Sequence, residues 1–182
     1  MKILGISGSL RKGSFNTALL RACVPLMPPG VELAIGSITG IPLYDGDLEA
    51  AQGIPAPVQA LKAKVIEADA LLLVTPEYNN SMPGVLKNAI DWLSRPPADI
   101  AKVFGGRPVA LMGASPGGFG TILSQNAWLP VLRTLGARTW SGGKMMVSRA
   151  GGVFNEAGEL ADEAVRTQLQ KYLAGFAAFA KG

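Results

Sequence analysis

Short apolar runs alternate with amphipathic, helix-like stretches along the whole chain, and this alternation restricts the fold more than any other property. Five runs have the length of strands and are bounded by Gly, Pro, Ser or Asp: residues 2–7, 31–37, 70–75, 107–114 and 137–141. Strands that are apolar on both faces and separated by helices are typical of a covered parallel sheet. We therefore predict an α/β fold, a three-layer sandwich around a five-stranded parallel sheet.

Helices are expected between these runs. Four lie near residues 16–27, 57–68, 85–94 and 121–135, and Pro25 and Pro130 should end or kink the first and the fourth. A fifth closes the chain, where an apolar stripe is formed by Leu160, Val165, Leu169, Leu173 and Phe176. Right-handed crossovers allow the strand order 2-1-3-4-5, and a single domain, residues 1–182, accounts for the length.

Composition removes several kinds of chemistry. The chain has no histidine and one cysteine, Cys23, which excludes Ser-His-Asp and Cys-His triads, imidazole metal ligands and an internal disulfide. Cys23 lies in an apolar helical run and is expected to be a small buried hydrophobe. Any catalysis must therefore be borrowed from a cofactor.

Charge and hydropathy limit the partners. The net charge of +4 suits an anionic ligand, but no basic run indicates a nucleic-acid surface. No apolar run is long enough to cross a membrane. The first residues enter a strand pattern with no long apolar region and no small-residue cleavage site, so we do not expect secretion. We expect a cytoplasmic protein with no nucleic-acid or membrane partner.

The loop after the first strand, residues 7–17, has the composition of a phosphate site. It leads into a helix whose N-terminus offers unpaired N–H donors, and Ser9, Ser14, Asn16 and Thr17 add polar hydrogens while Arg11 adds a positive charge. Ser-Phe stands where a triphosphate loop has Lys and Ser/Thr, and no cysteine nucleophile is present. A monophosphate is the expected ligand. The alternative is a plain strand-to-helix turn with Asn16 as its N-cap.

Two further loops follow the third and fourth strands, at the edge where such sheets bind ligands. Residues 75–84 contain two prolines and a glycine, so their backbone groups are held rigidly and suit a flat heterocycle. Glu77 and Tyr78 could equally be capping or packing groups. Residues 115–120, Ser-Pro-Gly-Gly-Phe-Gly, allow close approach of a ligand to the backbone, or form a simple turn.

These loops resemble those of the NADPH-dependent FMN reductase family. The matching segments are Gly-Ser-Leu-Arg-Lys-Gly-Ser-Phe-Asn at 8–16, Pro-Glu-Tyr-Asn at 76–79, Lys-Asn-Ala-Ile-Asp-Trp-Leu-Ser at 87–94 and Ser-x-Gly-x-x-Gly at 115–120. The resemblance covers essentially the whole chain. It implies a flavodoxin-like fold, bound FMN, NADPH or NADH as co-substrate, and small acceptors such as quinones, chromate or azo compounds.

The resemblance also assigns residues to FMN. The phosphate would be bound by Ser9, Arg11, Ser14, Phe15 and Asn16. The isoalloxazine would be bordered by Pro76, Glu77, Tyr78, Asn79, Ser115, Gly117 and Gly118. No catalytic side chain and no metal are implied, because the flavin carries the chemistry. Asn80 and Met82 occupy positions that vary among relatives, so the acceptor is not predicted.

Two other functions stay open. A flavodoxin-type carrier would bind FMN and shuttle single electrons, but such carriers are typically acidic and lack an arginine in the phosphate loop, so Arg11 and the positive charge favour a reductase. A binding module would hold FMN without turnover. Relatives assemble as dimers or dimers of dimers, which implies a homodimer or homotetramer here. Trp92 and Leu93 offer apolar surface for it, unless a monomer buries both against its own sheet.

Overall fold

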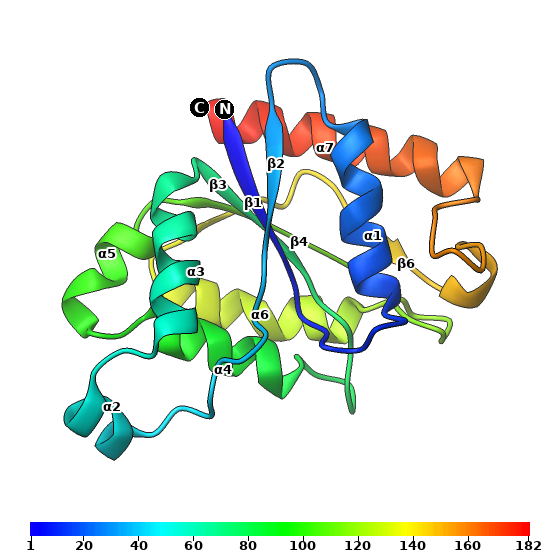
Figure 1. Cartoon of the computed structure of the whole chain (residues 1–182). Coiled ribbons are helices and arrows are strands. Elements are labelled where there is room, and N and C mark those ends of the chain that lie inside the picture. Colours follow the sequence, from blue (N-terminus) through cyan, green and yellow to red (C-terminus); the bar gives the residue numbers. More distant parts are fainter.

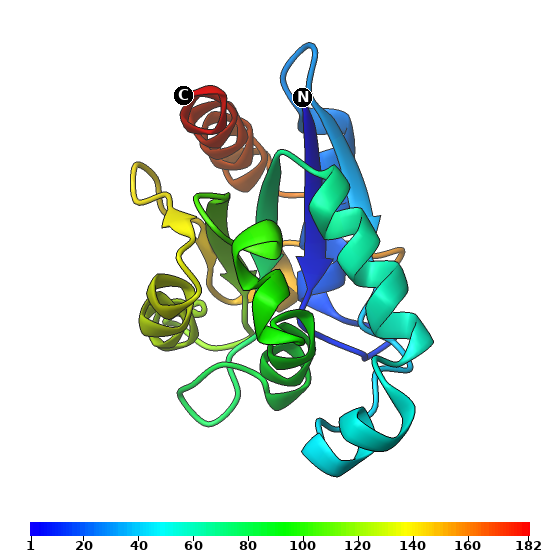
Figure 2. The same cartoon turned by 90° about the vertical axis from the view of Figure 1, so that its left-hand side faces the viewer.

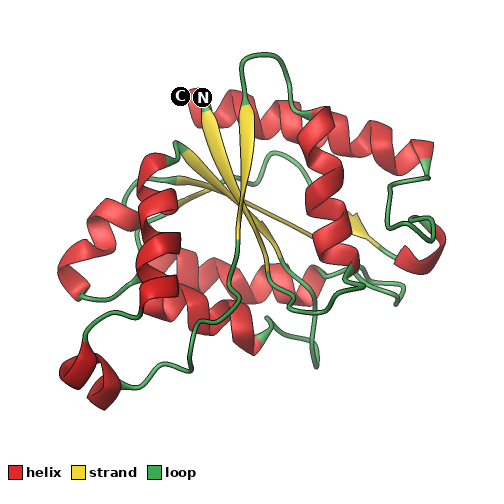
Figure 3. Ribbon diagram, viewed as in Figure 1, coloured by secondary structure: helices red, strands yellow, loops and turns green.

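A parallel sheet runs through the centre of the protein, whose 182 residues are all described by a computed structural model (Figure 3). Its strands are β1 (Lys2–Ser7), β2 (Glu32–Gly36), β3 (Ala70–Val74), β4 (Pro108–Ala114), β5 (Arg138–Thr139) and β6 (Met146–Val147). Their order is β2-β1-β3-β4-β5, every pair is parallel, and β6 lies beside β4. The predicted α/β class and strand order are confirmed.

Helices cover both faces of the sheet (Figures 1 and 2). On one face lie α1 (Phe15–Cys23) and α7 (Glu163–Lys181). On the other lie α3 (Ala56–Glu67), α4 (Gly84–Leu93), α5 (Ile100–Val103) and α6 (Ile122–Thr134). A short helix α2 (Gly46–Gln52) buries none of its residues, and single turns of 3-10 helix span Val24–Leu26, Pro97–Asp99 and Ala150–Gly152.

The central strand β3 shows why the runs are apolar throughout. All five of its residues are buried; Leu72 and Val74 belong to the core beneath α1 and α7, whereas Leu71 and Leu73 belong to the core beneath α3, α4 and α6. Each buried leucine is worth roughly 1.5–3 kcal/mol. Neither face of the strand meets water, so no polar residue alternates along it.

The strand predicted over residues 137–141 is shortened to β5, and a sixth strand, β6, lies farther along the chain, outside the predicted range. β5 pairs with Pro108 and Val109, and β6 pairs farther along β4 with Gly113 and Ala114. Between them the Trp140 ring packs on α7, with its centroid 4.8 Å from that of Tyr172. The Trp140 N–H still donates to Val109 O of β4 at 2.8 Å, and the chain leaves β4 after this residue before it returns as β6.

Three helical predictions also need correction or refinement. Pro25 follows the end of α1 as predicted, but Pro130 does not end α6, which continues to Thr134. Pro130 and Asn126 are both exposed, so water can satisfy the Asn126 carbonyl that lacks its helical donor. Leu160 precedes α7 and pairs with Phe154 in an isolated bridge, so it contributes to the core from a hairpin.

The chain ends and the three unusual loops lie at opposite ends of the sheet. Both termini are at the top of Figures 1 and 2, whereas the loops that follow β1, β3 and β4 lie toward the bottom. These three strands are neighbours, so their loops meet at one edge. None of the helices has the length and hydropathy that a bilayer crossing requires.

Candidate functional site

The loop between β1 and α1, called loop 1 (residues 8–14), is packed directly against the loop after β3, called loop 2 (residues 75–83). The Gly8 N–H donates to the Val74 carbonyl at 2.8 Å, which extends the strand pairing by one residue. A Cβ at Gly8 would lie 2.8 Å from Leu86 Cδ2 and 3.0 Å from Pro76 Cδ. Only glycine allows this approach, and it brings the two loops together.

Loop 1 ends in a set of free backbone donors at the start of α1. Ser14 is the N-cap, and its Oγ accepts the Thr17 N–H at 3.2 Å. The alternative with Asn16 as N-cap is therefore wrong. The N–H groups of residues 13–16 have no acceptor in the protein, nor do those of Ser9 and Leu10. Such donors, together with the helix dipole, suit an anion.

The Asn16 side chain neither caps the helix nor is free to bind a phosphate, the two roles that the composition of the loop suggested. Its side chain is buried, and its Nδ2 donates to the Ala114 carbonyl while its Oδ1 accepts the Ala114 N–H, both at 2.9 Å. Ala114 is the last residue of β4. The amide therefore ties α1 to the start of the loop after β4, and only its backbone N–H is left for a ligand.

Loop 2 contains a tight turn. Tyr78 and Ser81 exchange two backbone hydrogen bonds of 3.1 and 3.0 Å, and the residues between them, Asn79 and Asn80, have φ values of 51° and 60°. Two positive φ values define a type I′ turn, which asparagine tolerates. The turn carries Tyr78 outward, with 44% of its surface exposed, so its ring is available to a ligand or a partner.

Glu77 resolves one of the open alternatives, because it is a capping group. Its Oε2 accepts the N–H groups of Leu123 and Ser124 at 2.9 and 3.1 Å, at the start of α6. Thr121, the N-cap of that helix, makes no side-chain capping bond of its own. A carboxylate in this position accepts hydrogen bonds from N–H groups that have no partner within the helix, and its negative charge interacts favourably with the helix dipole. The Glu77 side chain thus fastens loop 2 to α6.

The loop after β4, called loop 3 (residues 115–120), is held from behind by the segment that follows β6. The Ser115 N–H donates to Val147 O at 2.9 Å, and the Arg149 N–H donates to Gly117 O at 3.0 Å. The N–H groups of Gly117 and Gly118 have no acceptor in the protein. Gly120 has a φ of 61° and lies against Met146, where a Cβ would be 2.9 Å from backbone.

Sequence reasoning missed β6 and Arg149 as parts of this edge. Arg149 is exposed and has a φ of 48°, a left-handed conformation that costs a non-glycine residue free energy. A strand of two residues, such as β6, is too short to show a periodic pattern in the sequence. Arg149, which follows it, was therefore not recognised either.

The three loops together form an edge rich in unpaired backbone donors. Arg11 makes no ion pair, and the Glu77 carboxylate is occupied by α6. The Cys23 thiol is buried and donates to Leu19 O, and burial raises its pKa well above the usual range, which confirms the buried-hydrophobe prediction. Free N–H groups beside a cation suit a phosphate, and those of Gly117 and Gly118 suit the edge of a flat ring. The residues present therefore fit FMN.

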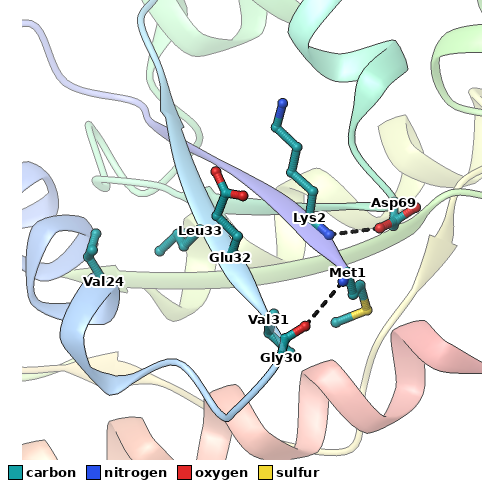
Figure 4. A pocket seen from close by; sticks show the side chains of 8 residues that line it. All are labelled: Met1, Lys2, Val24, Gly30, Val31, Glu32, Leu33 and Asp69. Carbon is teal, nitrogen blue, oxygen red and sulfur yellow. Dashed lines mark hydrogen bonds between the residues drawn. The ribbon is translucent and has the colours of Figure 1, made fainter.

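A broad hollow at the opposite end of the sheet does not compete with this edge. It has a volume of about 720 Å³ and lies beside the start of β1 and β2 (Figure 4). Two of its donors are already paired: the Met1 amino group donates to Gly30 O at 3.1 Å, and the Lys2 N–H donates to Asp69 Oδ2 at 2.7 Å. The hollow lies at the amino ends of the strands, where open α/β sheets do not bind ligands.

Known proteins match this chain over nearly its full length. An NAD(P)H-dependent FMN reductase of Pseudomonas aeruginosa is 45% identical, with 95% of this chain and 91% of that protein covered. A 2-hydroxy-1,4-benzoquinone reductase of Burkholderia is 37% identical, with 100% and 97% covered, and a quinone reductase of Escherichia coli is 38% identical, with 98% and 95% covered.

A solved structure and a family model agree with these relatives. The flavoenzyme NAD(P)H:(acceptor) oxidoreductase FerB of Paracoccus denitrificans superposes with a TM-score of 0.88 at 32% identity, covering 99% of this chain and 97% of that one. Residues 1–152 match the model of the NADPH-dependent FMN reductases. The loops, the sheet and the relatives lead to one conclusion: this chain belongs to the NADPH-dependent FMN reductase family.

Proposed function

We propose that the protein transfers hydride from NADPH or NADH through bound FMN to a small acceptor such as a quinone, and that residues 1–182 form one FMN-binding domain. The observation that carries this proposal is the set of free N–H donors of loop 1 beside Arg11, on the same edge as loops 2 and 3. Family membership supports FMN, and the names of two relatives, a benzoquinone reductase and a quinone reductase, support the acceptor class.

The phosphate of FMN would be bound by loop 1. Arg11 supplies the full charge, and the backbone N–H groups of residues 13–16 supply hydrogen bonds at the positive end of α1. Ser9 and Ser14 add hydroxyl donors. Phe15 and Asn16 contribute through the backbone, because the Asn16 amide is committed to Ala114.

The ring of FMN would lie between loops 2 and 3. Pro76 and Asn79 shape the loop-2 side, Glu77 contributes its backbone, and Tyr78 offers an exposed ring. On the loop-3 side Ser115 orients the turn, and the Gly117 and Gly118 N–H groups can stabilise negative charge on the reduced ring. FMN, when bound, supplies the redox chemistry. The chain contributes positioning and electrostatics, since it has no histidine to move protons near neutral pH.

FMN binding is tested by titrating apo-protein and following flavin fluorescence. We expect one FMN per chain, with much weaker binding of riboflavin, which lacks the phosphate. Arg11→Ala should weaken FMN by about 1.5–3 kcal/mol, or roughly 10- to 150-fold, the worth of a charge-assisted hydrogen bond. The control is Arg133→Ala, which removes an exposed arginine of α6 that makes no ion pair. Unchanged affinity in Arg11→Ala would remove Arg11 from the site.

The two rival functions differ in their response to NADPH. A flavodoxin-type carrier needs a separate reductase protein, whereas a reductase is reduced by the nucleotide alone. In a binding module the FMN would be reduced neither by NADPH nor by a separate reductase protein, or the reduced FMN would not be reoxidised by any acceptor. Quinone, chromate and azo-dye turnover measured in parallel would rank the acceptors.

We further propose a homodimer or homotetramer, although Trp92 and Leu93 do not support it, because both are fully buried against the protein's own sheet. The support comes from exposed apolar side chains on and near α6: Phe119 is 80% exposed, Leu123 42% and Leu129 45%. Light scattering that gave the mass of one chain at micromolar concentration would overturn this proposal. We also expect a cytoplasmic location, where nicotinamide nucleotides are supplied; cell fractionation tests it.

A further inference from the structure

A second hollow lies on the outer flank of loop 1, between that loop and the carboxyl end of the edge strand β2. It has a volume of about 270 Å³ and is lined by residues of loop 1, α1 and the segment 35–39 after β2. The hollow is smaller than a typical small-molecule pocket of roughly 300–1,000 Å³. It therefore suits one end of an extended ligand rather than a whole cofactor.

The charges around this hollow are all positive. Arg11, Lys12 and Arg21 line it, no aspartate or glutamate does, and none of the three cations forms an ion pair. Arg11 is assigned to the FMN phosphate, so Lys12 and Arg21, with the hydroxyl group of Thr39, are left for another ligand. Unpaired cations with hydroxyl donors and no carboxylate are the composition of a phosphate site.

The same hollow offers apolar surface. Leu10 is 54% exposed and Ile35 is 43% exposed, and both line it together with Leu20 and Ile38. A ligand that carries a phosphate beside a flat, weakly polar ring would use both features at once. Inorganic phosphate would use only the cations.

We propose that this hollow binds the adenosine 2′-phosphate end of NADPH, with Lys12 and Arg21 as the residues that distinguish NADPH from NADH. The inference rests on the proposed function, in which NADPH or NADH delivers hydride to bound FMN. Lys12 and Arg21 also line a different, neighbouring hollow of about 290 Å³ along α1. Glu156 lines that hollow, and its carboxylate would repel a phosphate, so the carboxylate-free hollow on the flank of loop 1 is favoured.

The test uses the FMN-loaded protein and calorimetric titration with adenosine 2′,5′-bisphosphate. Adenosine 5′-monophosphate, which lacks only the 2′-phosphate, is the matched ligand, and inorganic phosphate is the third arm. We expect the bisphosphate to bind at least about tenfold more tightly than the monophosphate, and Lys12→Gln and Arg21→Gln each to reduce that preference several-fold. The Arg133→Gln control should retain it. Equal binding of the two adenosine ligands, or competition by inorganic phosphate at similar concentrations, would overturn the proposal.

Kinetics separate this inference from the proposed function. In Lys12→Gln and Arg21→Gln the KM for NADPH should rise several-fold while the KM for NADH stays unchanged. In Arg21→Gln, which lies outside loop 1, the affinity for FMN should also stay unchanged. Equal changes in the KM for NADPH and for NADH, or loss of FMN binding in Arg21→Gln, would mean that the hollow does not recognise the 2′-phosphate and would refute the proposal. Absence of flavin reduction by either nucleotide in the wild-type protein would instead refute the proposed function.

Discussion

Replacing Asn16 with alanine should destabilise the apo-protein by about 2–4 kcal/mol. The substitution removes two hydrogen bonds of 2.9 Å at a residue that is only 4% exposed, and it leaves the Ala114 N–H and carbonyl without partners. Each unsatisfied buried group costs roughly 1–3 kcal/mol. A total near 2–4 kcal/mol is a large part of a typical stability of about 5–15 kcal/mol. It corresponds to a fall in Tm of roughly 4–16 °C for a chain of this size.

The assay is urea unfolding of FMN-free protein followed by circular dichroism. Asn155→Ala is the matched control, because Asn155 also makes two side-chain hydrogen bonds of 2.9 Å, to Glu159, but on an exposed hairpin. We expect that control to lose no more than about 0.5 kcal/mol. Unchanged apo stability in Asn16→Ala with a selective loss of FMN would refute the structural role and make Asn16 a direct ligand of the phosphate.

Asn16→Asp adds a pH signature to the same position. Aspartate keeps the acceptor for the Ala114 N–H but places a second oxygen against the Ala114 carbonyl. The protonated carboxyl can donate there, so its folded pKa should lie above the unfolded value near 3.9. Stability contributed by a raised pKa is present at low pH and lost as pH rises. The variant should therefore be closer to wild type at pH ~4 than at pH ~7, and a constant difference would contradict this reasoning.

The remaining predictions concern other parts of the account. Glu77→Ala should lower stability by about 1–2 kcal/mol through loss of the α6 cap, as should Asp162→Ala at the cap of α7, measured by urea unfolding; only the first should also weaken FMN. Asn80→Gly should stabilise the turn by a few tenths of a kcal/mol, because Asn-Gly is the favoured type I′ pair, and a loss of stability would refute that turn. Cys23 should react with a thiol reagent only on unfolding. Because burial raises its folded pKa, stability should fall above pH ~8.5 by up to about 1.4 kcal/mol per pH unit more than in Cys23→Ala.

The strand order and the edge at which the three loops meet could be predicted from the sequence because each depends on a regular signal. The apolar runs of β1, β3 and β4 are long enough to show that both faces are buried, and their loops are marked by Gly, Pro and Ser. The helix α2 carried no such signal, since none of its residues is buried and only Asp45 caps it. In the segment between β5 and β6 Trp140 packs against α7, a contact between distant parts of the chain that the sequence does not show.

The roles of individual site residues were harder to predict than the site itself. The sequence places Asn16 and Glu77 in loops at the carboxyl end of the sheet, as the structure does. It did not show that each is engaged with a backbone that lies far away in the sequence, at Ala114 and at Leu123. A polar residue in a loop can bind a ligand or hold the loop in place, and only the tertiary contacts distinguish the two.

Anaerobic reduction of the FMN-loaded protein by NADPH tests the central claim most directly. In a stopped-flow spectrometer, stoichiometric NADPH alone should bleach the visible flavin absorbance completely, and a quinone added afterwards should restore it. Tyr78→Phe should leave the rate of bleaching nearly unchanged, since no side-chain proton transfer is required. A flavin that stays oxidised with NADPH and NADH, or whose reduction collapses in Tyr78→Phe, would contradict the account.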